Sequence, residues 1–139
     1  MHIGIEVKKR DVIILSVKNE NGKCFPLDYL KISLKSESVS ECIDFRKNFE
    51  MFVQEKNVNK ISLISCSKES SKIRIIIEFI IQEIAVMQKI KIDTYASNAI
   101  SRTKKMFEKN YGYSFGDFYH HYNLPALTEN AFLVAWRFF

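Results

Sequence analysis

Proline and glycine are scarce in this chain, with only 2 prolines and 4 glycines among 139 residues. Flexible linkers, collagen-like repeats and disordered tails need far more of these residues. Hydrophobic residues make up 47% of the sequence and charged residues 27%, which supplies enough apolar surface for one hydrophobic core. We therefore expect residues 1–139 to fold as a single domain.

Cysteine is also rare, and its spacing forms no recognisable metal or disulfide pattern. Cys24, Cys42 and Cys66 are an odd number of thiols at wide intervals, with no Cys-x-x-Cys pair and no histidine at zinc-finger spacing. This pattern argues against a disulfide-stapled secreted protein and against structural zinc. It is typical of a reduced, cytoplasmic protein.

Long uninterrupted hydrophobic runs are absent. The most apolar region, residues 73–87, contains Arg74, Glu78 and Gln82, which are too polar for the centre of a membrane-spanning helix. The N-terminal residues have no basic leader, apolar block and small-residue cleavage site of a secretory signal. The sequence predicts a cytoplasmic protein without a membrane partner.

Positive charge exceeds negative charge in this composition. The chain has 21 Lys and Arg residues against 16 Asp and Glu residues, a formal net charge of +5. Such an excess favours polyanionic partners, nucleic acid above all, although a protein partner is equally compatible with it.

The first third of the chain has the two-residue alternation of β-strands. Residues 3–7 and 12–17 are rich in β-branched side chains and are joined by a short polar connection, which predicts a hairpin. Asn21 and Gly22 tolerate positive φ and predict a second tight turn. Residues 29–34 alternate again, so we expect a three-stranded antiparallel meander.

Helical and strand patterns alternate in the middle of the chain. Ser40 is a candidate N-cap for an amphipathic helix that ends at Glu55. Residues 60–66 form a short apolar run typical of a strand buried inside a sheet. A strongly apolar helix is expected to follow, capped by Ser70 or Ser71.

The last third predicts one more strand and two helices. Residues 91–95 are expected to form the fifth strand, Ser97 to cap a basic helix, and residues 127–139 to form a terminal helix. The polar and aromatic segment 111–123 between these helices is predicted to be a surface loop. Because crossovers between parallel strands are right-handed, this order predicts an α/β fold with a mixed five-stranded sheet: a three-strand meander, then parallel strands, with helices on both faces.

Three segments carry a resemblance to a known superfamily. They are residues 3–7 (Ile-Gly-Ile-Glu-Val), residues 62–66 (Ser-Leu-Ile-Ser-Cys) and residues 128–135 (Thr-Glu-Asn-Ala-Phe-Leu-Val-Ala). Together with the element order over nearly the whole chain, they resemble a small uncharacterised bacterial family within the RNase H/RuvC-like superfamily. The resemblance implies an RNase H-like fold.

The resemblance also implies a metal site. Active members hold two divalent cations, Mg²⁺ or Mn²⁺, with acids from the first strand, the end of the fourth strand and the last helix, because phosphodiester hydrolysis needs hard oxygen ligands. By position, Glu6 corresponds to the first acid and Glu129 to the last, so both are predicted catalytic residues and metal ligands. The fourth-strand acid is missing, and Glu69 in the following loop is the nearest substitute. Asn130 is an auxiliary candidate as a neutral oxygen ligand.

Each candidate acid also has a purely structural interpretation. Glu6 could point to solvent or to a lysine, Glu129 could be an ordinary first-turn helix carboxylate, and Glu69 a common loop acid. The neighbouring His120 and His121 are best interpreted as residues of a surface loop, although His121 precedes the last helix closely enough to assist the acids as an auxiliary group.

A cluster of cations marks the predicted nucleic-acid interface. It lies on the basic helix and consists of Arg102, Lys104, Lys105 and Lys109. A solvated helix face explains the same residues equally well. The aromatic side chains of segment 111–123 could stack on unpaired bases beside it, but a segment folded over its own rings is the preferred interpretation.

Two functional hypotheses follow. The first is a divalent-metal-dependent nuclease or resolvase-like domain that acts on nucleic-acid phosphodiesters through Glu6, Glu129 and Glu69. The alternative is a catalytically degenerate RNase H-like module that binds nucleic acid or a protein partner. A phosphotransferase of the actin-like superfamily is disfavoured because residues 8–11, between the first two strands, are Lys-Lys-Arg-Asp and not a glycine-rich phosphate-binding turn.

Overall fold

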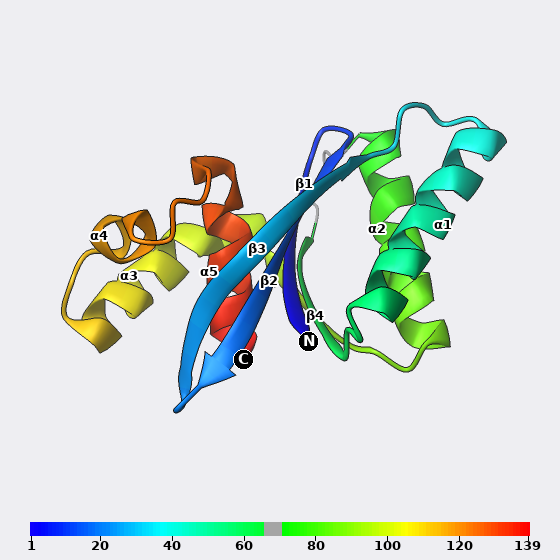
Figure 1. Cartoon of the computed structure of the whole chain (residues 1–139). Coiled ribbons are helices and arrows are strands. Elements are labelled where there is room, and N and C mark those ends of the chain that lie inside the picture. Colours follow the sequence, from blue (N-terminus) through cyan, green and yellow to red (C-terminus); the bar gives the residue numbers. More distant parts are fainter. Residues whose placement is uncertain (66–70) are drawn as a thin grey trace.

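A computed structural model describes residues 1–65 and 71–139 (Figure 1). The strands are β1 (His2–Lys8), β2 (Asp11–Glu20), β3 (Lys23–Ser33), β4 (Lys60–Ser65) and β5 (Lys91–Ala96). The helices are α1 (Val39–Glu55), α2 (Lys72–Met87), α3 (Ile100–Tyr111), α4 (Phe115–His120) and α5 (Glu129–Phe138), with 3-10 turns at Ser97–Ala99 and Ala126–Thr128.

The strands form one mixed sheet in the order β3-β2-β1-β4-β5. β1 pairs antiparallel with β2 and parallel with β4, and β4 pairs parallel with β5. Asn21 and Gly22 have φ values of 55° and 76° and close the turn between β2 and β3, as predicted from their identity. The predicted mixed five-stranded sheet, meander first and parallel strands after it, is confirmed.

Helices cover both faces of the sheet, also as predicted. In Figure 1, α1 and α2 lie on one side, and α3, α4 and α5 lie on the other. Successive side chains of β1 point to opposite faces of the sheet, so they enter two different cores. Ile3, Ile5 and Val7 pack with α1 and α2 on one face. Gly4 and Glu6 therefore point to the opposite face, under α5.

Several element boundaries differ from the predicted ones. The cap of α1 is Ser38, whose hydroxyl accepts a hydrogen bond from the Glu41 backbone N–H, so Ser40 lies inside the helix. Ser71 caps α2, in agreement with one of the two predicted candidates. Ser97 caps nothing, because a 3-10 turn separates it from α3.

Two further boundaries differ from the predicted ones. β3 begins at Lys23, directly after the turn, because pairing with β2 extends it well before the alternating stretch at residues 29–34. The terminal helix begins at Glu129, after the turn Ala126–Thr128. Among the described residues, no helix is both long enough and apolar enough to cross a membrane.

Candidate acidic site and nucleic-acid interface

The position of Glu6 is set by how closely β1 approaches α5. A Cβ atom built on Gly4 would lie 1.9 Å from the backbone oxygen of Ala131, so only glycine allows this approach. Two residues further along β1, Glu6 lies on the same face. The first turn of α5 therefore sits over the Glu6 carboxylate, which the structure brings together with Asn130.

The Glu6 side chain is 12% exposed, and its carboxylate has two neighbours of different kinds. Its Oε2 accepts a hydrogen bond of 2.9 Å from the Asn130 side-chain amide, and its Oε1 lies 3.5 Å from the ammonium of Lys8. Oε1 is buried, with no hydrogen-bond partner in the described part of the chain. Of the structural interpretations of Glu6, pairing with a lysine is therefore the one that the structure shows.

Glu129 faces a different environment from Glu6. It is the first residue of α5 and lines a hollow of about 430 Å³ with Tyr119, His120 and Asn123, together with Gly116, Leu124 and Ala126. The hydroxyl of Tyr119 shares a hydrogen bond with Thr128. Burial, reinforced by the negative charge of Glu129 and opposed by this hydrogen bond, raises the pKa of Tyr119 to about 12.

The predicted surface loop contains a short helix, so the prediction is wrong for His120, which lies in that helix, whereas His121 lies in the exposed turn that follows it. Residues Phe115–His120 form helix α4, whose cap Ser114 accepts a hydrogen bond from the Asp117 backbone N–H at 3.0 Å. His120, and not His121, lines the hollow with Glu129. The Ser114-x-x-Asp117 spacing was the available signal for this helix, since it is a form of the N-terminal capping pattern.

The predicted set of metal ligands is only partly assembled. No group of three or more His, Cys, Asp or Glu side chains that could hold a metal occurs among residues 1–65 and 71–139. Glu69 and Cys66 fall outside the described residues. The predicted ligands are therefore not gathered in such a group among the described side chains, and Oε1 of Glu6 lies beside the Lys8 ammonium without accepting a hydrogen bond.

The predicted cationic cluster on α3 is divided between two faces of the helix. Arg102, Lys105 and Lys109 recur at intervals of three and four residues, so they share one exposed face. None of these three side chains forms an ion pair within the described parts of the chain. Lys104 projects from a different face and lies over the Phe115 ring, 5.8 Å from its centroid.

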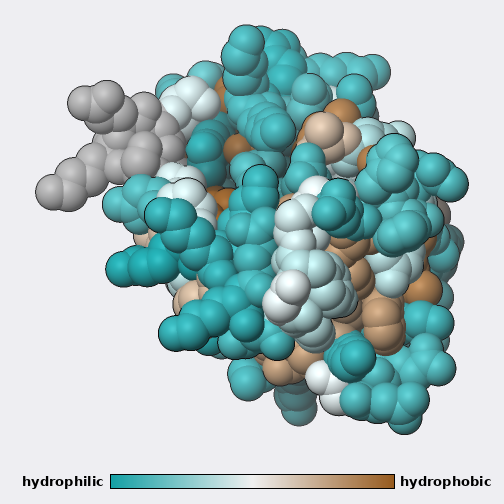
Figure 2. All heavy atoms as spheres, turned by 90° about the vertical axis from the view of Figure 1, so that its left-hand side faces the viewer, coloured by the Kyte–Doolittle hydropathy of each residue, from teal (hydrophilic) through white to brown (hydrophobic). Residues whose placement is uncertain are grey.

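The side of the molecule that carries α3 and α4 is predominantly hydrophilic. Figure 2 shows this side, where teal predominates and the most extended hydrophobic surface lies right of the centre. Most rings of segment 111–123 are used internally: Phe107 of α3 packs against Tyr111, Phe115 and Phe118. This arrangement agrees with a segment folded over its own rings.

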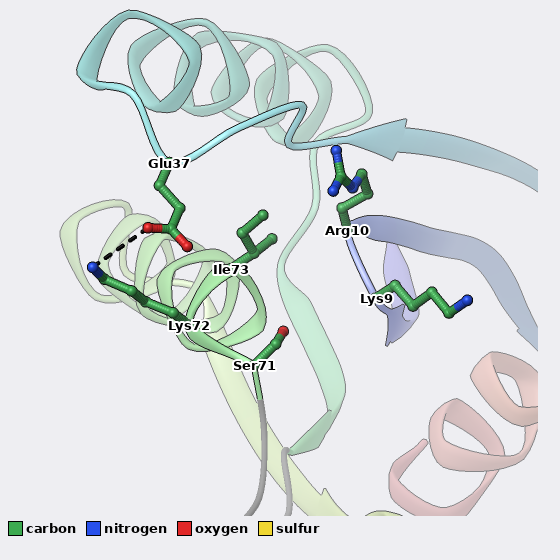
Figure 3. A pocket seen from close by; sticks show the side chains of 6 residues that line it. All are labelled: Lys9, Arg10, Glu37, Ser71, Lys72 and Ile73. Carbon is green, nitrogen blue, oxygen red and sulfur yellow. Dashed lines mark ion pairs between the residues drawn. The ribbon is translucent and has the colours of Figure 1, made fainter.

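A second group of cations, which the sequence did not single out, surrounds a cavity of about 250 Å³ beyond the end of β1 (Figure 3). Lys9, Arg10 and Lys72 line it, together with Glu37, Ser71 and Ile73. Lys72 pairs with Glu37 at 3.4 Å, and Arg10 donates a hydrogen bond of 2.8 Å to the backbone oxygen of Lys35. In Figure 3 the side chain of Lys9 points away from both Glu37 and Lys72.

Comparison with solved structures decides the fold. RuvC of T. thermophilus, solved in complex with a Holliday junction substrate, matches with a TM-score of 0.69 over 97% of this chain and 90% of that chain, at 9% identity. The fold is RNase H-like. Fowlpox virus resolvase, solved with substrate Holliday junction DNA, matches with a TM-score of 0.60 over 99% of this chain and 95% of that one, at 11% identity.

Sequence comparisons add no family to this result. The chain matches no protein-family model and no curated protein. The resemblance predicted from residues 3–7, 62–66 and 128–135 is therefore confirmed for the RNase H-like fold and its similarity to RuvC, without a sequence family. At 9–11% identity, this similarity concerns the fold and not the activity.

Proposed function

We propose that this domain binds nucleic acid, and branched or duplex DNA in particular, as a non-catalytic RNase H-like module. The observation that supports this most directly is the row of exposed cations on α3, Arg102, Lys105 and Lys109, none of which has an ion-pair partner among the described residues. Ammonium and guanidinium groups that are not neutralised within the protein are available to phosphates. The RuvC and fowlpox virus resolvase structures described above were both determined with Holliday junction DNA.

The surroundings of Glu6 favour a binding role over catalysis. A metal pair requires several carboxylates at one point, because their negative charge offsets that of the cations. Here the partners of Glu6 are a neutral amide and an ammonium, Asn130 and Lys8. The Lys8 ammonium therefore supplies, beside the Glu6 carboxylate, the positive charge that a bound metal cation would supply there. We place this binding activity in the cytoplasm, in keeping with the free thiols of Cys24 and Cys42.

Binding of a labelled four-way DNA junction, measured by fluorescence anisotropy, tests the proposal. Each cation that contacts a phosphate adds about 0.9 to the slope of log affinity against log salt, so Arg102→Glu with Lys105→Glu should weaken binding at least about tenfold and reduce that slope. Lys47→Glu is the control for the single variant Lys105→Glu, since Lys47 is also an exposed lysine and lies on α1, across the sheet.

Two results would contradict the binding proposal. One is equal weakening by the single variants Lys105→Glu and Lys47→Glu, which change the net charge by the same amount and would then indicate only a general charge effect. The other is affinity that does not depend on salt, which would instead favour a protein partner. Comparing the junction with a linear duplex of the same length then measures any preference for branched DNA.

Metal-dependent cleavage is a second candidate function, favoured by the buried Oε1 of Glu6 that lacks a hydrogen-bond partner in the described structure. Calorimetric titration with Mn²⁺ tests it. If Glu6 and Glu129 are ligands of Mg²⁺ or Mn²⁺, Glu6→Gln should abolish binding and Glu129→Gln should weaken it. No heat of binding at millimolar Mn²⁺ would leave the non-catalytic module as the better proposal.

A further inference from the structure

The hollow between α4 and the start of α5, which we call the α4 hollow, has the size of a small-ligand site. It measures about 430 Å³, and cavities of about 300–1,000 Å³ commonly bind small molecules through an apolar wall and a few convergent polar groups. Neither the cations of α3 nor the partners of Glu6 account for it. Its lining has both components: small or apolar residues, Gly116, Leu124 and Ala126, and polar ones, His120, Asn123 and Glu129.

The polar side chains of the α4 hollow are not used within the protein. Across residues 1–65 and 71–139, the side chains of His120, Asn123 and Glu129 form no hydrogen bond and no ion pair. The hydroxyl of Tyr119, in contrast, is engaged by Thr128, so what Tyr119 offers to a ligand is its ring. A ligand in the hollow would therefore meet a carboxylate, an imidazole, an amide and an aromatic ring.

The Glu129 carboxylate determines which ligand chemistry fits this lining. It has acceptor oxygens and no donor, and it repels phosphate groups. Among the DNA bases, only guanine presents adjacent donors, N1–H and the N2 amino group, on its Watson–Crick edge. One carboxylate can accept both, as it does from the paired N–H groups of a guanidinium. The amide of Asn123 can donate to guanine O6, and rings such as Tyr119 and His120 are surfaces on which unpaired bases stack.

A cation next to α4 is available for the phosphate of such a nucleotide. Lys104 of α3 lies over the Phe115 ring, 5.8 Å from its centroid, and Phe115 directly precedes Gly116 of the hollow. Among the described residues, Lys104 has no ion-pair partner. Phosphate contacts hold a nucleic acid in place, whereas contacts to base edges distinguish one sequence from another.

From this chemistry we propose that the α4 hollow binds a guanine base displaced from a nucleic-acid strand. Glu129 accepts the N1 and N2 hydrogens, Asn123 donates to O6, and the base lies against Tyr119. The inference rests on the proposed function, because it takes the base from bound nucleic acid. It adds to that function a preference for one base, which the phosphate contacts of α3 cannot provide.

Titration with free nucleotides tests the site without requiring DNA binding. In calorimetry with the full chain, guanosine monophosphate should bind at least about fivefold more tightly than adenosine monophosphate, because one bidentate pair discriminates between bases by this factor or more. Glu129→Gln should abolish this preference, since its amide retains only one acceptor oxygen. Asp117→Asn is the matched control, because it removes the same charge from an exposed residue of α4 outside the hollow.

Gly116→Leu tests the hollow by adding side-chain volume to its wall. A Cβ atom at this position would meet only the Ser114 hydroxyl, at 3.9 Å, so the helix accommodates a side chain there. The variant should weaken the binding of guanosine monophosphate at least about fivefold, since it occupies space that the base needs. Its affinity for a fully paired DNA duplex should stay unchanged, which a misfolded protein would not show.

Duplexes with one unpaired nucleotide test the source of the base. In fluorescence anisotropy, a duplex with a bulged guanine should bind at least about fivefold more tightly than one with a bulged adenine. Equal affinities for these duplexes would overturn the nucleic-acid source of the guanine.

Two outcomes of the nucleotide titration would overturn the site itself. They are equal binding of the two monophosphates by the wild type, and a guanine preference that survives in Glu129→Gln or is lost in Asp117→Asn. If these occur while the fully paired duplex still binds, only the guanine site is refuted. Absence of binding to every duplex would refute the proposed function, and with it the displaced base as the ligand.

Discussion

Replacing Gly4 with alanine introduces a methyl group where α5 crosses β1. The new Cβ would lie 1.9 Å from the backbone oxygen of Ala131, 2.9 Å from its carbonyl carbon and 3.0 Å from the Cβ of Ala135. Atoms in van der Waals contact are about 3.5 Å apart, so the helix would have to move by roughly 1.5 Å. The obstacle is backbone, which cannot rotate away as a side chain can.

The expected cost follows from what α5 buries. Six consecutive residues of this helix, 131–136, are buried, so a shift of the helix loosens the whole core on that face. Overpacking typically costs 1–3 kcal/mol, and a clash with backbone lies at the upper end, so we expect Gly4→Ala to destabilise the protein by about 3 kcal/mol. For a chain of this size that corresponds to a fall in melting temperature of about 10 °C.

Equilibrium unfolding in urea, with thermal melting, measures this loss. Gly116→Ala is the control, because a Cβ there meets only the Ser114 hydroxyl at 3.9 Å and alanine favours the helix α4. Adding Ala135→Gly to Gly4→Ala should not restore stability, since it removes only the 3.0 Å contact. A Gly4→Ala protein within about 1 kcal/mol of the wild type would refute the close approach and, with it, the placement of Asn130 over Glu6.

Three further perturbations have defined outcomes. Burial, with the positive charge of Lys60, lowers the pKa of His2 from 6.5 to about 4, so the unfolded chain binds an extra proton between these pH values. The free energy of unfolding should then fall as the pH drops through this window, by at most about 1.4 kcal/mol per pH unit and by less after solvent screening. Urea titrations at pH 7, 6 and 5 should show that this free energy decreases less with falling pH in His2→Gln than in the wild type. Asn130→Asp places a second carboxylate against Glu6 and should lower the stability by about 1–3 kcal/mol in melting experiments without metal. Millimolar Mn²⁺ should restore that stability, and a variant that stays destabilised would count against a cation at this position. Burial raises the pKa of Cys24 to about 12, so this thiol should be unreactive in the folded protein. Cys24→Ser should therefore react with a disulfide reagent at pH 8 as fast as the wild type does. A slower reaction of the variant would show that Cys24 is accessible.

Local pattern was sufficient for the sheet. The alternation of residues 3–7 and 12–17, and the Asn21-Gly22 pair, describe interactions between chain neighbours, and these elements formed as predicted. Element ends were less predictable because they depend on pairing across the structure. β3 begins at Lys23 because β2 offers a partner there, although its own alternation starts later.

Helix α4 shows where the pattern was misread. Aromatic side chains at residues 111–122 suggested a loop, because their packing partners lie elsewhere in the chain. Phe107 and Phe132 pack against these rings and bury them. Because the rings are buried by residues outside the segment, the residues after the cap Ser114 can form a helix. The hollow shared by His120 and Glu129 exists only once this helix is in place.

The sequence by itself determined the fold class, the strand order and the presence of an acid in the first strand, because periodicity, turn chemistry and the handedness of crossovers act over short stretches of chain. Only the tertiary structure decided the partners of that acid. Glu6 meets Asn130 because Gly4 lets α5 approach β1, whereas Glu129, one residue away on the helix, lines the α4 hollow. Adjacent helical residues differ by about 100° in direction, so which of them reaches the strand depends on how the helix is seated, and no local pattern specifies that.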